Sequence, residues 1–511
     1  IAINEEEIQN IAGNFYDRPD GAAYSDKEHP YVNDLDIFGR ASLFQYVNRT
    51  TSEPAEVLLA NDLMHAAPFE NIIDRQGAIK ELSSDINWLQ DMHANGRKSP
   101  IKLATVARLE HWLKQPPTFS KFKAWSWLRY LLPLIIILIV VGFIFDFVSI
   151  TALLLGLLFF AILAYQINKY VAPLHEQLSN VAGEFETLER NIIKIESREF
   201  KSKLLSALSD SVRKNSRGAG SSINTLKKIL DRLDLRYNLV LSAPLNLLLL
   251  WNLQQALDLE KWKFENEDSI GGWINTLAQF EALGSFSVLH FNHPEWSFPT
   301  ITRDYFSIEG EEIGHPLIKE NKRINNDISI PDDEHIMLIT GSNMAGKSTY
   351  LRSIGVNIVL AFAGSPVCAK NFSVSYVKLM SSMRITDNLE ESTSTFYAEL
   401  KKLKTIIESV NAGENVFILL DEILRGTNSL DRHTGSKALI RQLMDKKAAA
   451  IIATHDLELA TDPGAYSTHL LNYHFDVQVN DEQLFFDYKL KTGICNSLNA
   501  SLLMKQIGIE I

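Results

Sequence analysis

The residues with the clearest chemical pattern are those from 341 to 348, which read GSNMAGKS. They fit the pattern G-x-x-x-x-G-K-[ST], in which backbone N–H groups surround phosphate oxygens, the lysine pairs with the β- and γ-phosphates, and the hydroxyl ligates Mg²⁺. In this chain the lysine is Lys347, and the hydroxyl belongs to Ser348, a predicted metal ligand. The predicted nucleotide contacts are Gly341, Ser342, Asn343, Met344, Ala345, Gly346, Lys347, Ser348 and Thr349.

Further reactive side chains follow two later apolar runs. Asp421 and Glu422 come directly after FILL at 417–420, and His455 follows another β-rich run. Asp421 can hold Mg²⁺ through water, and Glu422 can orient or deprotonate an attacking water. Taken alone, the two acids would indicate a helix cap or a solvent-facing pair, and the histidine an ordinary packed group. With a phosphate loop upstream, we predict Lys347, Glu422 and His455 as catalytic residues and Asp421 as a metal ligand.

The elements that must position these side chains are short apolar runs at 336–340, 416–420 and 448–454, which alternate with helical stretches such as 349–360. Near-continuous apolar runs are typical of parallel strands that are buried on both faces. Ligands bind at the carboxyl ends of such strands, where the polar residues stand. The sequence therefore predicts a C-terminal α/β domain of the P-loop NTPase class.

Composition excludes several classes of protein. The chain has 511 residues, of which 46% are hydrophobic and 22% charged, with a formal net charge of −12. Such a composition excludes a disordered or collagen-like chain, and the acidic balance argues against a general nucleic-acid binder. Two cysteines cannot build a disulfide framework, so we expect a reducing setting. The chain begins at Ile1, and we expect it to be a fragment.

A long apolar block runs from Trp125 to about Ile167. One membrane-spanning helix needs about 20 apolar residues, so the block fits two spans, predicted at 127–145 and 147–166. Asp146 would then lie at the tip, in the far interface. Lysines and aromatic residues flank the block, which favours both ends on the cytoplasmic side. The alternative is a buried helical hairpin in a soluble domain.

After Pro173, apolar residues alternate in steps of four and three as far as Ile195. This spacing predicts the seam of a long helix that packs against another helix. The partner is either the domain's own core or a helix of a second chain, and the spacing does not choose between them.

Four motifs, taken in order, resemble the ATPase domain of the MutS family of mismatch-repair proteins, a branch of the ABC ATPase superfamily. They are TGSNMAGKSTYLRS at 340–353, STSTFYAEL at 392–400, LLDEILRGTNSLD at 419–431 and ATHDLELA at 453–460. The resemblance implies ATP and Mg²⁺ bound between two identical subunits. It also implies that Ser394 approaches the γ-phosphate held by the other subunit, that Asn343 supports the phosphate loop, and that Asp431 belongs to the loop linking the two sites.

The chain also departs from that family. The mismatch-reading and connector domains of the repair members do not fit in the segment before residue 34, and the apolar block interrupts the helical core. This looks like a membrane-anchored branch of the family, often with another membrane hairpin upstream. Where repair relatives stack an aromatic residue on adenine, this sequence has Arg323, whose guanidinium can also stack on a purine.

The fold class expected from these observations is an α/β P-loop NTPase domain, ABC-type and MutS-like, after an all-α core and lever domain that a transmembrane helical hairpin interrupts. The expected boundaries are 1–120 and 171–305 for the helical core and lever, 121–170 for the hairpin and 306–511 for the ATPase domain.

We expect a homodimeric ATPase at the cytoplasmic membrane whose closure upon ATP moves helices joined to the bilayer. One hypothesis adds DNA binding of mismatch-repair type. The other is an ATP-driven switch that acts on a membrane or protein partner without DNA. The ATPase half of an ABC transporter fits less well, because the STF segment replaces the usual Ser-Gly-Gly signature.

Overall fold

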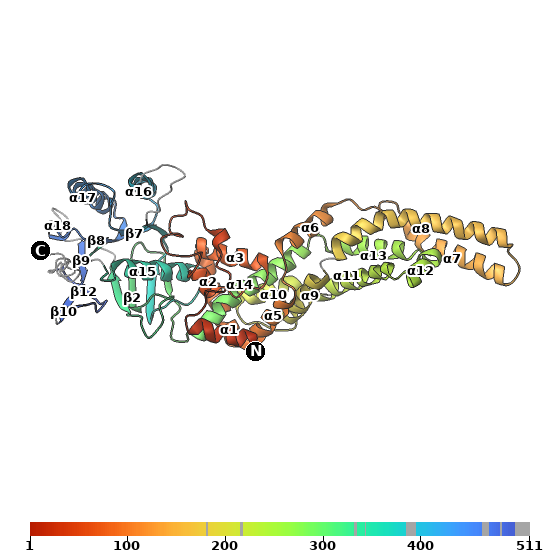
Figure 1. The fold of residues 1–511 in the computed structure, drawn as a ribbon, viewed down its shortest axis with the longest axis horizontal. Helices are drawn as coiled ribbons and strands as arrows, with labels where there is room; N and C mark the ends of the chain where they lie inside the picture. Colours follow the sequence, from red (N-terminus) through yellow and green to blue (C-terminus); the bar gives the residue numbers. More distant parts are fainter. Residues whose placement is uncertain are drawn as a thin grey trace. The chain divides into compact units, whose positions relative to one another are not determined.

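The computed structural model describes residues 1–179, 182–214, 218–331, 335–342, 344–384, 395–461, 470–480 and 483–495. The chain forms two compact units (Figure 1). Unit 1 comprises Ile1–Asn48, Leu59–Ile86 and Leu283–Ile511, and unit 2 comprises Arg49–Leu58 and Asn87–Ala282.

Unit 1 is built on a six-stranded sheet with the order β12-β9-β4-β8-β7-β6. All neighbouring strands in it are parallel except β12 and β9. The strands are β4 (Ile336–Thr340), β6 (Lys378–Ser382), β7 (Val416–Asp421), β8 (Ala449–Thr454), β9 (Leu470–Phe475) and β12 (Leu490–Thr492). Thus β4, β7 and β8 lie where the apolar runs predicted strands, and their carboxyl ends meet at one edge.

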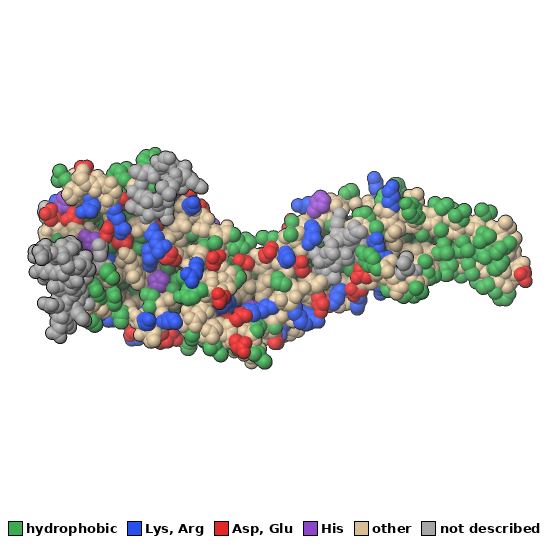
Figure 2. Space-filling model, viewed as in Figure 1, with side chains coloured by type: hydrophobic (Ala, Val, Ile, Leu, Met, Phe, Trp, Pro, Cys, Tyr) green, Lys and Arg blue, Asp and Glu red, His purple; other side chains and the backbone are tan. Residues whose placement is uncertain are grey.

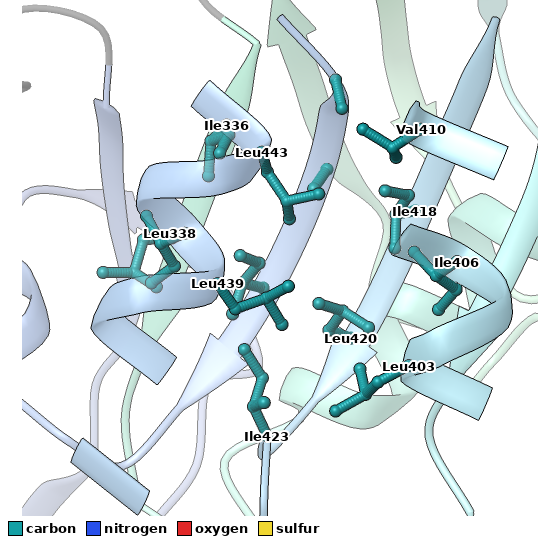
Figure 3. Packing of buried hydrophobic residues seen from close by; sticks show 14 of the residues in the cluster. Ile336, Leu338, Leu403, Ile406, Val410, Ile418, Leu420, Ile423, Leu439 and Leu443 are labelled. Atoms are coloured by element: carbon teal, nitrogen blue, oxygen red, sulfur yellow. The ribbon is translucent and has the colours of Figure 1, made fainter. Parts of the chain in front are cut away.

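Three helices follow these strands in unit 1: α15 (Lys347–Phe362), α16 (Thr395–Asn411) and α17 (Ser429–Asp445). Figure 3 shows leucines and isoleucines of α16 and α17 packed against the side chains of β4 and β7. Leu338 and Ile418, two members of this cluster, are fully buried. Burying one such side chain stabilises the fold by about 1.5–3 kcal/mol, so this layer holds the strand ends in place.

A second sheet of unit 1 has the order β1-β5-β2-β3. Its strands are β1 (Thr300–Thr302), β2 (Ile308–Ile313), β3 (Asn326–Ile330) and β5 (Asn371–Ser375). The remaining elements wholly within unit 1 are α1 (Ala2–Ile11), η1 (Ala22–Tyr24), α2 (Leu43–Val47), α4 (Phe69–Ser83), α18 (Glu458–Thr461), β10 (Gln478–Asn480) and β11 (Gln483–Phe485).

The N-terminal segment is part of the ATPase unit, which differs from the predicted boundary between residues 305 and 306. The buried Asp34 carboxylate accepts hydrogen bonds from Ser381 Oγ at 2.7 Å and from the Arg384 N–H at 3.0 Å. It also lies 3.0 Å from Lys402 Nζ on α16. A carboxylate buried in this way needs these partners, and they come from segments that are far apart in the sequence.

Unit 2 is helical. The elements within it are α6 (Leu103–Lys114), α7 (Ala124–Ile144), α8 (Ile150–Ser179), α9 (Ala182–Glu196), α10 (Lys203–Arg213), α11 (Ala219–Asp234), η2 (Leu235–Tyr237), α12 (Leu239–Leu249) and α13 (Trp251–Asn266). The unit boundaries fall within α3 (Glu53–Met64), α5 (Ile86–Lys98) and α14 (Ile270–Asn292).

The apolar seam that begins after Pro173 lies on the end of α8 and on α9. Its members Phe185, Leu188, Ile192 and Ile195 are buried, and α9 packs against α11 of the same chain. The seam therefore serves the core of unit 2. Helix α8 continues through Pro173, where the sequence suggested a new helix would begin.

The apolar block forms the helical hairpin α7–α8. The first helix begins three residues before the predicted start, and the second begins at Ile150. Two stretches, Ala124–Ile144 and Ile150–Pro173, are long and apolar enough to cross a membrane, and only 11% of an apolar 18-residue segment in each is buried. Figure 2 shows hydrophobic side chains covering this part of unit 2. Asp146 lies in the turn with φ of 61°, a conformation that aspartate tolerates better than most residues.

Candidate functional site

Three predicted catalytic side chains meet at the carboxyl edge of the main sheet. Lys347 begins α15 after β4, Glu422 follows β7, and His455 follows β8. Nε2 of His455 lies 2.6 Å from Oε1 of Glu422, and Nζ of Lys347 lies 3.3 Å from the same ring nitrogen. Because β8 lies between β4 and β7 in the sheet, the histidine stands between the other two groups.

Lys347 is almost fully buried, with 5% of its surface exposed. Its ammonium group donates hydrogen bonds to the carbonyl oxygens of Gly341, at 2.8 Å, and Ser342, at 3.0 Å. Burial lowers the pKa of Lys347 to about 8, although the nearby carboxylates of Glu422 and Asp421 raise it. The lysine side chain therefore reaches back to the start of its own loop. Phosphate oxygens, which are stronger acceptors for an ammonium group, could replace these two carbonyl oxygens.

The loop from 341 to 346 needs its two glycines. Gly341 has φ of +146°, and a Cβ there would lie 2.8 Å from the carbonyl oxygen of Phe475. Gly346 has φ of +109° and caps α15, with Tyr488 3.2 Å from where a Cβ would be. Side chains at these positions would force the loop open, so the space for phosphate at the start of α15 depends on both. Asn343 lies outside the described residues.

Asp421, the last residue of β7, and Glu422, which follows it, both contact the guanidinium of Arg425. Arg425 Nε lies 2.9 Å from Glu422 Oε2, and Arg425 Nη2 lies 3.5 Å from Asp421 Oδ2. The hydrogen bond from His455, followed by the charges of Arg425, His455 and Lys347, lowers the pKa of Glu422. Glu422 is therefore held ionised, as a group that accepts a proton must be. Sequence reasoning did not single out Arg425.

A second residue that the sequence analysis missed is Glu399 on α16. Its buried carboxylate accepts a hydrogen bond of 2.5 Å from the N–H of Leu424, in the loop that follows Glu422. Burial raises the pKa of Glu399, and hydrogen bonds from Leu424, Arg425 and Gly426 oppose that rise. Glu399 thus fixes the loop that carries Glu422. The quoted motif STSTFYAEL contains this residue, but only the fold shows what it holds.

Strain in this loop shows why it needs such an anchor. Glu422 has φ of 56° and Leu424 has φ of 60°, both in the left-handed region. Residues other than glycine persist there only when their surroundings hold them, at a cost of about 1–3 kcal/mol each.

The remaining predicted site residues lie in different surroundings. Ser348 is half-buried at the second position of α15. Asp431 is exposed in the first turn of α17, where Asn428 Nδ2 donates to its carboxylate at 2.7 Å and its own N–H donates to Asn428 Oδ1 at 2.9 Å. In the single chain this is a helix cap. Ser394 lies outside the described residues.

A cavity of about 280 Å³ adjoins the loop, and Arg323 does not line it. Its lining includes Ile324, Tyr488, Thr349, Gly346, Tyr350 and His315. The Arg323 guanidinium instead lies over the ring of Trp296, 5.9 Å from its centroid, and donates to Asn325 Oδ1 at 3.2 Å. Ile324 and Tyr488, rather than the Arg323 side chain, therefore line the cavity beside the loop.

His315 lines the same cavity. Burial, reinforced by the charge of Arg352, lowers the pKa of His315 to about 4. Its imidazole is therefore neutral at pH 7 and offers the cavity an uncharged polar edge.

Comparison with known proteins finds similarity in the region that holds this site. A family model described as MutS domain V matches residues 337–504. The chain is 34% identical over 230 residues to the DNA mismatch repair protein MutS of Aquifex pyrophilus. The matched region covers 44% of this chain and 26% of that protein. It is 31% identical over 268 residues to the DNA mismatch repair protein MutS 2 of Halobacterium salinarum, covering 50% and 30% respectively. It is 32% identical over 204 residues to the MutS protein homolog 4 of Homo sapiens, covering 38% and 22%. The chain thus spans less than a third of the length of these relatives.

Proposed function

Because the chain belongs to the MutS family through its domain V, we propose that it is an ATP hydrolase whose two nucleotide sites lie between two copies of the chain. The observation that carries this proposal is the meeting of Lys347, Glu422 and His455 at adjacent strand ends. Nothing in the packing of the core requires two acids, a lysine and a histidine at one edge, whereas phosphoryl transfer uses each of them.

The residues present fit a nucleotide triphosphate and its metal ion. Gly341 and Gly346 let the loop lie against Phe475 and Tyr488, where a Cβ would be too close, and the buried ammonium of Lys347 donates to two loop carbonyl oxygens that phosphate oxygens can replace. Ser348 and Asp421 supply the oxygen ligands that Mg²⁺ prefers. The ion would spread the charge that develops on the transferred phosphoryl group.

The roles of the protein groups follow from their contacts. Glu422, held ionised by His455 and Arg425, accepts the proton of a water that attacks the γ-phosphate. His455 orients Glu422 through their contact of 2.6 Å, and Lys347 neutralises the phosphates. The chemistry depends mainly on geometry, which is why the strained loop and its anchor Glu399 matter. Ser394 of a second copy would complete the site, and Asp431 would lie in the loop between the two sites.

Membrane attachment is the second part of the proposal. The hairpin α7–α8 exposes apolar side chains over lengths that suit a bilayer, and its base is tied to α13 by polar contacts. Arg129 bonds to Gln254 Oε1 and Asp258 Oδ1, each at 2.9 Å, and Glu260 Oε1 accepts the N–H groups of Thr118, at 2.6 Å, and Phe119, at 3.0 Å. We infer that the ATPase unit lies in the cytoplasm and the hairpin in the cytoplasmic membrane, because lysines flank both ends of the apolar block.

Two kinds of partner are considered as the regulator of ATP turnover. Two of the three relatives are named DNA mismatch repair proteins, which favours regulation by DNA. The net charge of −12 favours the alternative, an ATP-driven switch for a membrane or protein partner, because phosphate contacts need clustered cations.

The test is ATP hydrolysis by the detergent-purified chain, with Mg²⁺ present or chelated and with or without duplex or branched DNA. We expect Mg²⁺-dependent activity that Lys347→Ala removes. Activity that persists in Lys347→Ala would overturn the site. Stimulation by DNA that weakens as salt rises would select DNA as the regulator, and its absence at low salt would select the alternative. With Glu422→Gln, ATP should convert monomers to dimers in light scattering, and a chain that stays monomeric would refute the shared site.

A further inference from the structure

The helix α12 is apolar and yet not buried. All of its residues except Ser242 and Asn246 are apolar. Among the side chains that the structure describes in it, residues 240–249, none is buried, and Val240 is 81% exposed. From its apolar sequence such a helix would be expected to be part of a core. In the structure, however, one side of α12 has no protein packed against it, among the described residues. Apolar helices that stay exposed mark an interaction surface.

The side chains of Asn238 and Asn246 already make hydrogen bonds within the protein. Asn246 Nδ2 donates to the Ser242 carbonyl oxygen at 2.9 Å, and Asn246 Oδ1 accepts the N–H of Asn252 at 3.0 Å. At the other end, Asn238 Oδ1 accepts the N–H groups of Val240 and Leu241. Apart from Ser242, the helix therefore offers the outside only hydrocarbon, which suits contact with lipid.

The position of α12 makes its surface continuous with the hairpin. It packs against both α7 and α8. Arg236, just before α12, donates to the Ala172 carbonyl oxygen at 3.4 Å, and Asn252, just after it, donates to Asn168 Oδ1 at 3.0 Å. Ala172 and Asn168 are one turn apart on α8, about 6 Å along its axis, whereas α12 is about 16 Å long. Both ends of α12 are therefore tied to neighbouring turns of α8 at the base of the hairpin.

Charged and aromatic side chains at the same base fit a membrane interface. Lys121, Lys123 and Lys169 are exposed there, as are the rings of Trp127 and Tyr237. Aromatic rings and lysines gather at the headgroup level of membrane proteins, where lysines also meet anionic lipids. At about 16 Å, α12 is too short to span a bilayer of about 30 Å, so only an in-plane position suits it.

We propose that α12 is a second membrane-binding element, an in-plane helix whose Val240 and Leu241 enter the headgroup and acyl boundary of an anionic bilayer. The inference rests on the proposed insertion of α7–α8, but it extends the bilayer contact to a segment that lies outside the hairpin. Such a helix would set the depth and angle of the hairpin, because it adds a line of contact where the hairpin leaves the lipid.

Depth-dependent quenching tests this proposal. Three variants of the full chain are made, Val240→Cys, Leu138→Cys in the hairpin and Phe264→Cys on α13. Each carries the polarity-sensitive dye NBD on its new cysteine. The chains are reconstituted in vesicles of phosphatidylcholine and phosphatidylglycerol with bromine placed either near the headgroup or deep in the acyl chains. Cys368 and Cys495 are buried, and burial raises the pKa of Cys368 to about 12, so the unsubstituted chain supplies the labelling background.

We expect the Val240 probe to lose emission most to shallow bromine and the Leu138 probe to deep bromine. The Phe264 probe, whose parent side chain is 80% exposed, should be unaffected by either. A quenched Leu138 probe with an unquenched Val240 probe would overturn the role of α12 and leave the anchored hairpin standing. An unquenched Leu138 probe would overturn membrane insertion itself. Equal quenching at Phe264 and Val240 would also reject the proposal, because α12 would then have no contact of its own.

Discussion

The carboxyl edge of the main sheet in unit 1 and the hairpin α7–α8 in unit 2 arrange the same kinds of residue in opposite ways. In unit 1, leucines such as Leu338 are fully buried, and the charged groups gather at one edge. In the hairpin, leucines such as Leu138 face outward, while Arg129 is turned toward Gln254 and Asp258. The difference teaches that apolar composition does not decide burial. It decides only that water is avoided, and a bilayer satisfies that condition as a core does.

The largest expected effect tests the polar edge. Glu422→Gln keeps the shape of the side chain but removes the proton acceptor, so we expect ATP hydrolysis to fall by about 10²–10⁴-fold while ATP still binds. Turnover and nucleotide binding are measured separately. Glu414→Gln, at an exposed glutamate paired with Lys378, is the matched control and should hydrolyse ATP normally. An unchanged rate in Glu422→Gln would remove this residue from the chemistry.

The same substitution in both regions tests the contrast in burial directly. Leu338→Ala empties part of a sealed core and should lower the free energy of unfolding of unit 1 by about 2–5 kcal/mol. Leu138→Ala, in detergent, should change it by less than about 0.5 kcal/mol, because detergent fills the vacated space. Denaturant unfolding measures both, followed by nucleotide-site protection for unit 1 and by the helical circular dichroism signal for unit 2. Equal losses would mean that the hairpin is packed as a soluble core.

A smaller effect is expected from the anchor of the strained loop. Glu399→Ala removes the acceptor of the Leu424 N–H and leaves buried donors unpaired, which costs about 1–3 kcal/mol of stability. If Glu399 positions Glu422, kcat should fall while KM changes little, and Glu399→Gln should restore part of the rate. Glu408→Ala, on the exposed face of the same helix, is the control. A loss of stability with unaltered kcat would make Glu399 a structural residue only.

The smallest effect concerns pH. Burial lowers the pKa of Lys347 to about 8 in the chain without nucleotide, whereas phosphate binding requires the charged ammonium. ATP affinity should therefore fall as the pH rises above about 8, toward tenfold per pH unit, and binding at pH 9 should take up a proton. Titration calorimetry in buffers of different ionisation enthalpy detects that proton. Binding that is independent of pH between 7 and 9.5 would contradict the shifted pKa.

Features of the fold and the site that depend on residues close in the sequence could be predicted, whereas those that depend on distant residues could not. Strands β4, β7 and β8 were predicted to within one residue, because each is a run of apolar residues buried on both faces. The two helices of the hairpin were predicted because each is a long run of apolar residues, which the sequence shows without any knowledge of distant contacts. The place of Asp34 in the ATPase unit was not predicted, because its partners are more than 340 residues away. Nor could the sequence show that the Arg323 side chain lies over Trp296, away from the loop cavity.

The sequence by itself determined the local chemistry and the solvent preference of each segment: a glycine-lined loop with its lysine, acids at the end of an apolar run, and two apolar helices joined at Asp146. Only the tertiary structure decided which of these groups meet. It brought His455 between Lys347 and Glu422, placed Glu399 under the strained loop, and left α12 exposed beside the hairpin. The physical reason is that backbone geometry and hydropathy act along the chain, whereas hydrogen bonds and packing act between residues that only the fold makes neighbours.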